Sequence, residues 1–143
     1  MTRRSFISST GIAALTFSIV KPGSVYGTKA NSRIEAGCIG LGNRGKMIAR
    51  MLEKLGGYHI TAVADYFANI TETAGKEFKV SKERRFSGLS SYKKLINSKV
   101  DAVFLETPPY CFPEHVEAAV KAGCHVYIAK PLGCDVPGCL KIA

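Results

Sequence analysis

A glycine-rich turn between an apolar run and an amphipathic segment is the feature that most constrains the fold of this chain. The apolar run begins at Ile34, and the turn that ends it reads Gly40-Leu41-Gly42-Asn43-Arg44-Gly45. Asp65 ends the next apolar run, a further 20 positions along the chain. A strand, a glycine turn, a helix and an acid in this order are typical of the βαβ unit that binds a dinucleotide.

Each glycine of the turn has a predicted role. Gly40 permits the tight turn, Gly42 lets the backbone approach a pyrophosphate, and Gly45 lets the helix pack closely on the strand. The helix N-terminus would present free N–H groups and the positive end of its dipole to the phosphates. The predicted cofactor site therefore contains Gly40, Leu41, Gly42, Asn43, Arg44, Gly45 and Asp65.

Asp65 is predicted to accept hydrogen bonds from the adenosine ribose; alternatively, it only ends a strand or caps a helix. Its carboxylate would repel a 2′-phosphate, and Tyr66 and Phe67 follow where an arginine would be needed to accept that charge. We therefore expect NAD as the cofactor and NADP as the less favoured one.

Alternating apolar and amphipathic segments after the turn predict an α/β fold, a doubly wound parallel sheet of the Rossmann type. The expected strands are 34–40, 58–64, 84–86, 100–105 and 125–129, and the expected helices are 46–55, 67–78, 91–96 and 113–122, with another beginning at Asp135. In helix 46–55 the side chains expected on the inward face are Met47, Ile48, Met51, Leu52 and Leu55. The ligand crevice should lie where the first and fourth strands end, between the glycine turn and Glu106-Thr107-Pro108.

The N-terminus predicts an export signal. Arg3 and Arg4 precede a ten-residue apolar stretch, 11–20, and a small-residue exit. The paired arginines favour the bacterial twin-arginine route into the periplasm, and the alternative is a flexible basic tail. The stretch is shorter than the roughly 20 residues that span a bilayer, so no stable membrane span is expected. We assign residues 1–30 to the signal and 31–143 to the dinucleotide-binding domain.

Composition argues against two other classes of site. The first 27 residues carry +3 of the net charge of +9, and the remaining +6 is scattered rather than gathered into a basic patch, so no nucleic-acid partner is expected. The five cysteines form no C-x-x-C pair and have no neighbouring histidine, which argues against a metal site and against a disulfide framework.

With these features, Lys130-Pro131 after the fifth strand makes the chain resemble the Gfo/Idh/MocA oxidoreductase family. The matching positions are the glycine turn, Asp65, 100–103, Thr107-Pro108, His115, 123–126 and Lys130-Pro131-Leu132. The resemblance implies a Rossmann domain that binds NAD or NADP and a second α/β domain with the substrate site. It also implies hydride transfer on a sugar or polyol.

By this resemblance, Thr107, Pro108 and Pro131 border the dinucleotide, and Lys130 is the catalytic lysine of the family's E-K-P motif beside the nicotinamide. A cation there can polarise a carbonyl or steady an alkoxide; the alternative is a surface lysine. Ala129 stands where the motif has glutamate, and Glu106 could take over from the neighbouring strand end.

The family's substrate domain has no counterpart within 143 residues. We therefore expect a cofactor-binding domain that is incomplete at its C-terminus, does not turn over a substrate alone, and associates with other copies through exposed apolar surface. Three other functions stay open: an NAD-using glycosidase on the same fold, a non-catalytic cofactor-binding module, and a methyltransferase. His115 is expected to pack or cap rather than to act as an acid or base, and His59 and His125 are expected to be structural.

Overall fold

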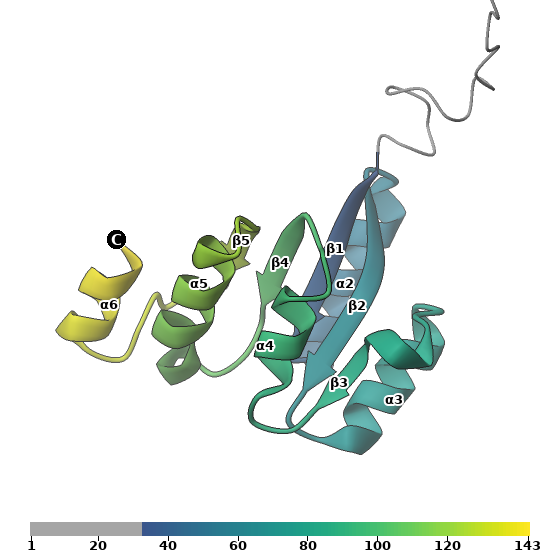
Figure 1. The fold of residues 1–143 in the computed structure, drawn as a ribbon, viewed down its shortest axis with the longest axis horizontal. Coiled ribbons are helices and arrows are strands. Elements are labelled where there is room, and N and C mark those ends of the chain that lie inside the picture. Colours follow the sequence, from purple (N-terminus) through teal and green to yellow (C-terminus); the bar gives the residue numbers. More distant parts are fainter. Residues whose placement is uncertain (1–32) are drawn as a thin grey trace, which may run out of the picture. The chain divides into compact units, whose positions relative to one another are not determined.

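The computed structural model describes residues 33–143, and the predicted export signal at residues 1–30 lies outside them (Figure 1). The described chain forms one five-stranded sheet in the order β3-β2-β1-β4-β5. The strands are β1 (Ile34–Ile39), β2 (Tyr58–Asp65), β3 (Arg85–Ser87), β4 (Ala102–Leu105) and β5 (His125–Ile128). The α-helices are α2 (Asn43–Leu55), α3 (Ala68–Glu77), α4 (Ser91–Ile96), α5 (Phe112–Lys121) and α6 (Val136–Ile142), and short 3₁₀ turns, η2 (Lys82–Arg84) and η3 (Pro109–Cys111), precede β3 and α5.

All neighbouring strands of the sheet run parallel. The chain winds outward from β1 to β3, then crosses back to place β4 on the other side of β1. Ile39 at the end of β1 pairs with Ala64 of β2 and Leu105 of β4, so three strands end at the same edge. The predicted doubly wound parallel sheet is confirmed, and its strand order reverses between β1 and β4.

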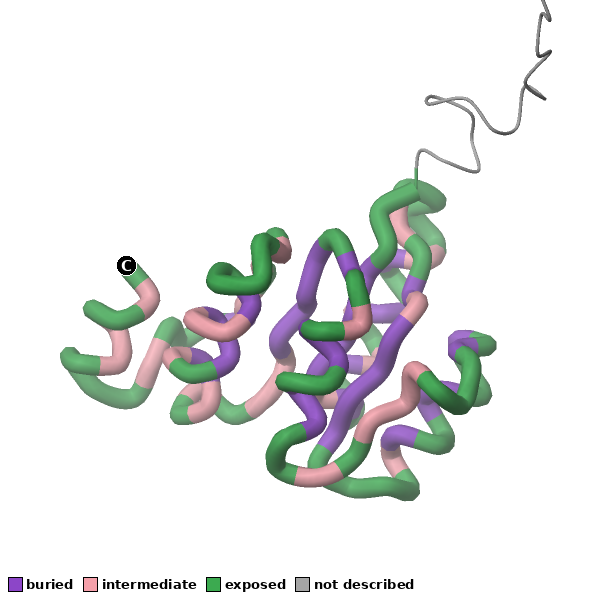
Figure 2. Tube along the Cα trace, in the orientation of Figure 1, coloured by how far each residue is buried: buried purple, intermediate pink, exposed green. Residues whose placement is uncertain are grey.

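Helices cover both faces of the sheet, and its central strands β1, β2 and β4 are the most buried part of the fold (Figures 1 and 2). Side chains of α2 and α3 pack with Ile60, Val63 and Phe104 in one apolar cluster. Side chains of α4 and α5 pack with Val103 and Leu105 in a second cluster on the opposite face. Helix α6 packs against α5, and its predicted N-cap is confirmed because the Asp135 side chain accepts a hydrogen bond from the Gly138 N–H at 2.7 Å.

The prediction for the first helix is wrong in two respects. Helix α2 begins at Asn43, three residues before the expected start, so Asn43, Arg44 and Gly45 form its first turn. Its inward stripe is made by Gly45, Ala49 and Leu52, with Ile48 half-buried beside them. The side chains of Met47, Met51 and Leu55 are exposed by 48%, 54% and 72%. Small residues set this stripe because they let the helix approach the sheet, and a search for large apolar residues overlooks them.

The remaining differences are small shifts at element ends. β2 extends through Asp65, β3 begins at Arg85, and β4 begins at Ala102 rather than at residue 100.

Cys38 is buried in β1 and Cys124 is half-buried before β5, and all five cysteines are free thiols. No helix within residues 33–143 is long and apolar enough to cross a membrane.

His115 is a packing residue of α5, as predicted. Its ring stacks on Tyr92 of α4 with 4.1 Å between ring centroids, and the residue is buried. The Tyr92 hydroxyl donates to Glu114 Oε1 at 2.5 Å. Burial lowers the pKa of His115 below its usual value of 6.5, with the Glu114 carboxylate opposing the shift. The histidine therefore joins two helices in its neutral form.

We expect Gly45→Ala to destabilise the fold by about 3 kcal/mol, because the added methyl group overlaps the carbonyl oxygen of Gly40 and the helix must move. Gly57→Ala is the matched control: a Cβ there meets no atom within 4 Å, and a change within about 0.5 kcal/mol is expected. Urea unfolding measures both, and equal stability of the two variants would contradict the close contact.

Folding stability should fall as the pH drops below 6.5, the pKa of a histidine side chain in an unfolded chain. Between pH 6.5 and the lower pKa of His115 in the folded chain, the unfolded chain binds a proton on this histidine and the folded chain does not. Each step down in pH across this interval therefore favours the unfolded state. We expect His115→Gln to reduce this slope between pH 6.5 and 5. Urea unfolding as a function of pH measures it, and an NMR titration placing the pKa of His115 above 6.5 would contradict the account.

Candidate functional site

The glycine turn lies where β1, β4 and α2 meet. Gly40 has a φ of +87°, and its N–H donates to the carbonyl of Ala64 at 2.9 Å. A Cβ at Gly40 would lie 2.7 Å from the carbonyl carbon of Glu106. The turn therefore touches the segment that follows β4, and the two sides predicted to line the crevice are adjacent.

Gly42 differs from the other two glycines of the turn, because nothing in the fold requires it. It precedes α2 with a φ of −63°, and a Cβ there would meet no atom within 4 Å. No side chain caps α2, and its first turn holds no acid. Backbone N–H groups at such a helix start need an acceptor, and an anion can supply it. The open space at Gly42 is thus a cradle that a side chain would fill.

Asp65 lies beside the turn and is buried, with 8% of its surface exposed. Its Oδ2 accepts a hydrogen bond from the N–H of Leu41 at 2.7 Å, and its Oδ1 accepts one from Phe67 at 3.0 Å. The carboxylate thus ties β2 to the glycine turn and fixes the residue that precedes α3. Each carboxylate oxygen has two lone pairs, so both retain an acceptor site for a ribose hydroxyl.

Glu106 and Arg44 form an ion pair between the end of β4 and the start of α2. Arg44 Nε donates to Glu106 Oε2 at 2.9 Å, joining the first turn of α2 to the end of β4. Only 3% of the Glu106 side chain is exposed, compared with 57% of the Arg44 side chain. In the described part of the chain Glu106 pairs with Arg44 and not with Lys130, so support of Lys130 by Glu106 remains a hypothesis.

Sequence reasoning placed Glu106 at the crevice but missed this pair. The two residues are 62 positions apart, and the glycine-turn motif that contains Arg44 does not include Glu106. The available signal was a carboxylate directly after the apolar strand β4 (Ala102–Leu105), which lies in the sheet beside β1, the strand that ends at the glycine turn.

The other predicted residues follow β4 and β5. Leu105 pairs with Ile128, so Thr107-Pro108 and Lys130-Pro131 leave neighbouring strands at the same edge. Thr107 Oγ1 lies 3.4 Å from His115 Nδ1. Lys130 is exposed and forms no ion pair within residues 33–143, and the buried Ala129 precedes it. The glycine turn, Asp65 and Thr107 therefore gather around β1 and β4, while Lys130 lies one strand further out.

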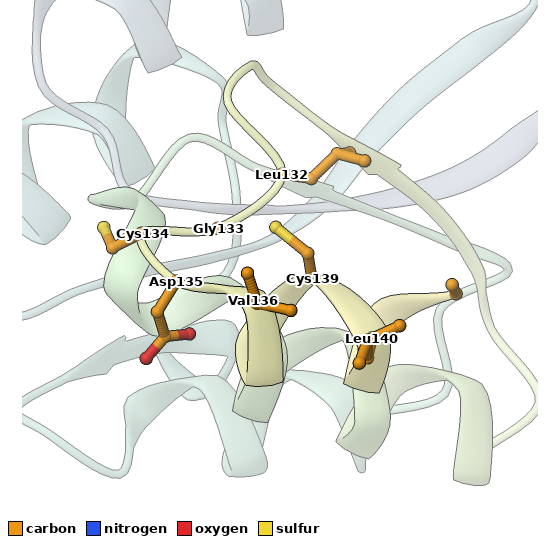
Figure 3. A pocket seen from close by; sticks show the side chains of 8 residues that line it. Leu132, Gly133, Cys134, Asp135, Val136, Cys139 and Leu140 are labelled. Carbon is orange, nitrogen blue, oxygen red and sulfur yellow. The ribbon is translucent and has the colours of Figure 1, made fainter.

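A hollow of about 540 Å³ lies beyond Pro131, between the segment after β5 and α6 (Figure 3). Its lining is mostly apolar and includes Leu132, Val136 and Leu140. None of the predicted site residues lines this hollow, so it is separate from the predicted cofactor site. Residues 33–143 contain no group of three His, Cys, Asp or Glu side chains placed to hold a metal ion.

Solved structures with the same fold are known. A myo-inositol 2-dehydrogenase from Lactobacillus plantarum is 31% identical, with a TM-score of 0.68 over 77% of this chain and 32% of that one. A scyllo-inositol dehydrogenase from Lactobacillus casei, solved with bound NAD(H) and scyllo-inositol, is 27% identical, with a TM-score of 0.65 over 74% and 30%. A UDP-N-acetylglucosamine 3-dehydrogenase from Acidithiobacillus ferrooxidans is 25% identical, with a TM-score of 0.62 over 74% and 32%.

The chain thus spans about a third of the length of these structures. Comparison with curated proteins gave no match. The family model described as an oxidoreductase family with an NAD-binding Rossmann fold matches residues 34–143, which include every strand of the sheet. The chain therefore belongs to the Gfo/Idh/MocA oxidoreductase family and comprises its NAD-binding Rossmann domain.

Proposed function

We propose that this chain is the NAD-binding part of an oxidoreductase that transfers hydride to or from a sugar or cyclic polyol. The observation that carries the proposal is the open cradle at Gly42, where the fold itself has no need of glycine. A position that keeps glycine with free space around it suits a ligand that approaches the backbone closely. The uncapped start of α2 beside it suits an anionic ligand.

The residues present fit a dinucleotide. Gly42 and the first turn of α2 would take the pyrophosphate, and the free lone pairs of Asp65 would take the adenosine ribose. Thr107 and Pro108, which follow β4, would border the other half of the ligand. When bound, NAD supplies the group that accepts or donates hydride.

Lys130 is the residue we assign to the chemistry. It follows β5 at the same edge of the sheet as the glycine turn. An ammonium group there would polarise a substrate carbonyl, or stabilise the alkoxide of a hydroxyl as hydride leaves the carbon. Ala129 offers no carboxylate beside it, so the proposed role of Lys130 is electrostatic rather than that of a base.

The names of similar solved structures support the proposed substrate class. Two of them are named as inositol dehydrogenases, and a third as a dehydrogenase of a nucleotide sugar. A polyhydroxylated ring is the feature that these named substrates share. The export signal at residues 1–30 and association between copies stay predictions from the sequence.

We expect Gly42→Val to weaken NAD binding at least tenfold, a loss of about 1.4 kcal/mol or more, because the side chain fills the space of the pyrophosphate. The fold should survive with a stability loss of about 1 kcal/mol or less, since a Cβ at Gly42 meets no atom within 4 Å. Isothermal titration calorimetry and urea unfolding measure the two effects.

Gly57→Val is the matched control, because Gly57 also has open space around its Cβ position but lies before β2, at the opposite end of the sheet. Its affinity for NAD should equal that of the unmodified chain. Undiminished affinity in folded Gly42→Val protein would show that the glycine turn is not the cofactor site.

Cofactor preference depends on the charge of Asp65. We expect the unmodified chain to bind NAD at least tenfold more tightly than NADP, since the carboxylate repels a 2′-phosphate. Asp65→Asn should reduce this ratio to below about threefold, with most of the change in the affinity for NADP. Asparagine is preferable to alanine because its one amide oxygen can still accept the hydrogen bond from the buried N–H of Leu41, although the bond from Phe67 is lost. Calorimetry with both cofactors measures the ratio, and tighter binding of NADP by the unmodified chain would refute the preference.

A further inference from the structure

Glu106 is a buried acid whose hydrogen bonds are only half made. Its Oε2 accepts from Arg44 Nε, whereas its Oε1 is buried and has no partner in residues 33–143. The backbone N–H of Glu106 donates to the carbonyl of Ile39 at 2.9 Å, which fixes the main chain against the end of β1. This bond holds the Glu106 backbone, and with it the carboxylate, beside the end of β1.

A buried carboxylate is tolerated when a cation pairs with it. Arg44 is the cation here, and the larger part of its side chain remains in solvent. Only Nε is engaged with the carboxylate, so the terminal amino groups of the guanidinium have no partner on Glu106. This arrangement fixes the guanidinium on one side and leaves donors on the other.

Arg44 lies in the first turn of α2, two residues after the open position at Gly42. An anion at this helix start would come close to the guanidinium and also close to the Glu106 carboxylate. Without Arg44, the carboxylate would act on that anion as an uncompensated like charge in a poorly solvated place. Whether the electrostatic potential beside Gly42 attracts or repels an anion therefore depends on the ion pair between Arg44 and Glu106.

We propose that Glu106 is a positioning residue for the dinucleotide: it holds Arg44 beside the cradle, and Arg44 neutralises it there. This inference rests on the proposed function, because the anion concerned is the pyrophosphate of NAD. The pair is thus part of the cofactor site and does more than tie α2 to β4.

The test is a double-mutant cycle on the full 143-residue chain, with NAD affinity measured by calorimetry. We expect Arg44→Ala to weaken NAD binding about tenfold or more, because it removes a contact and uncovers a buried charge. Adding Glu106→Gln should restore at least threefold of that loss, since the amide has the shape of the carboxylate without its charge. Thermal unfolding of the unliganded proteins measures stability separately.

Arg50→Ala is the matched control. Arg50 also belongs to α2 and pairs with a carboxylate, that of Glu77, but this pair is largely exposed. Arg50→Ala should change the affinity for NAD less than twofold, and adding Glu77→Gln should leave that affinity unchanged. If Arg44→Ala does not fold, Arg44→Gln replaces it, because glutamine can still donate a hydrogen bond to Glu106 but carries no charge.

Two results would overturn the inference. The first is an Arg44 variant that melts at a lower temperature than the unmodified chain but binds NAD as tightly as the Arg50 variant does. That result would mean that the Arg44–Glu106 pair serves only the fold. The second is a double variant that binds as weakly as the Arg44 variant alone. An unmodified chain that fails to bind NAD would instead reject the proposed function, and this inference with it.

Discussion

The close contact between α2 and the end of β1 is the constraint on which the crevice depends. Gly45 sits so near the carbonyl of Gly40 that any side chain there would overlap it. This approach starts the helix at Asn43, directs Leu41 into the core, and brings Arg44 within reach of the strand that leaves at Glu106. One backbone contact therefore places a helix start, a cation and a carboxylate around the same small space.

In the proposed cofactor site, the single carboxylate of Asp65 would serve both the fold and the ligand. Two backbone N–H groups occupy one lone pair on each oxygen, so the side chain is oriented before any ligand arrives. A group held in this way loses little freedom on binding. The structure shows the end of β2 at Asp65 and a hydrogen bond from Phe67 before α3, as the alternative from the sequence describes, and ribose binding stays a prediction.

The sequence was enough to predict the parallel sheet, its reversal at β1 and β4, and the glycine turn, because these depend on local patterns. It failed for the face of α2, where Gly45 and Ala49 rather than Met47 and Met51 turn inward. Small residues are required where α2 lies close to the sheet, and a search for regularly spaced large apolar residues does not find them. The Arg44–Glu106 pair was also out of reach, because it forms only when two segments far apart in the chain are brought together by the sheet.

The outward placement of Met47 and Met51 has a chemical consequence. About half of each side chain is open to solvent, so both thioethers are accessible to peroxide. Conversion to sulfoxides would add polar groups to a flank of α2 that is already in water and would leave the inward stripe of Gly45, Ala49 and Leu52 untouched. Oxidation at these two positions would therefore change the surface of the domain and leave its core intact.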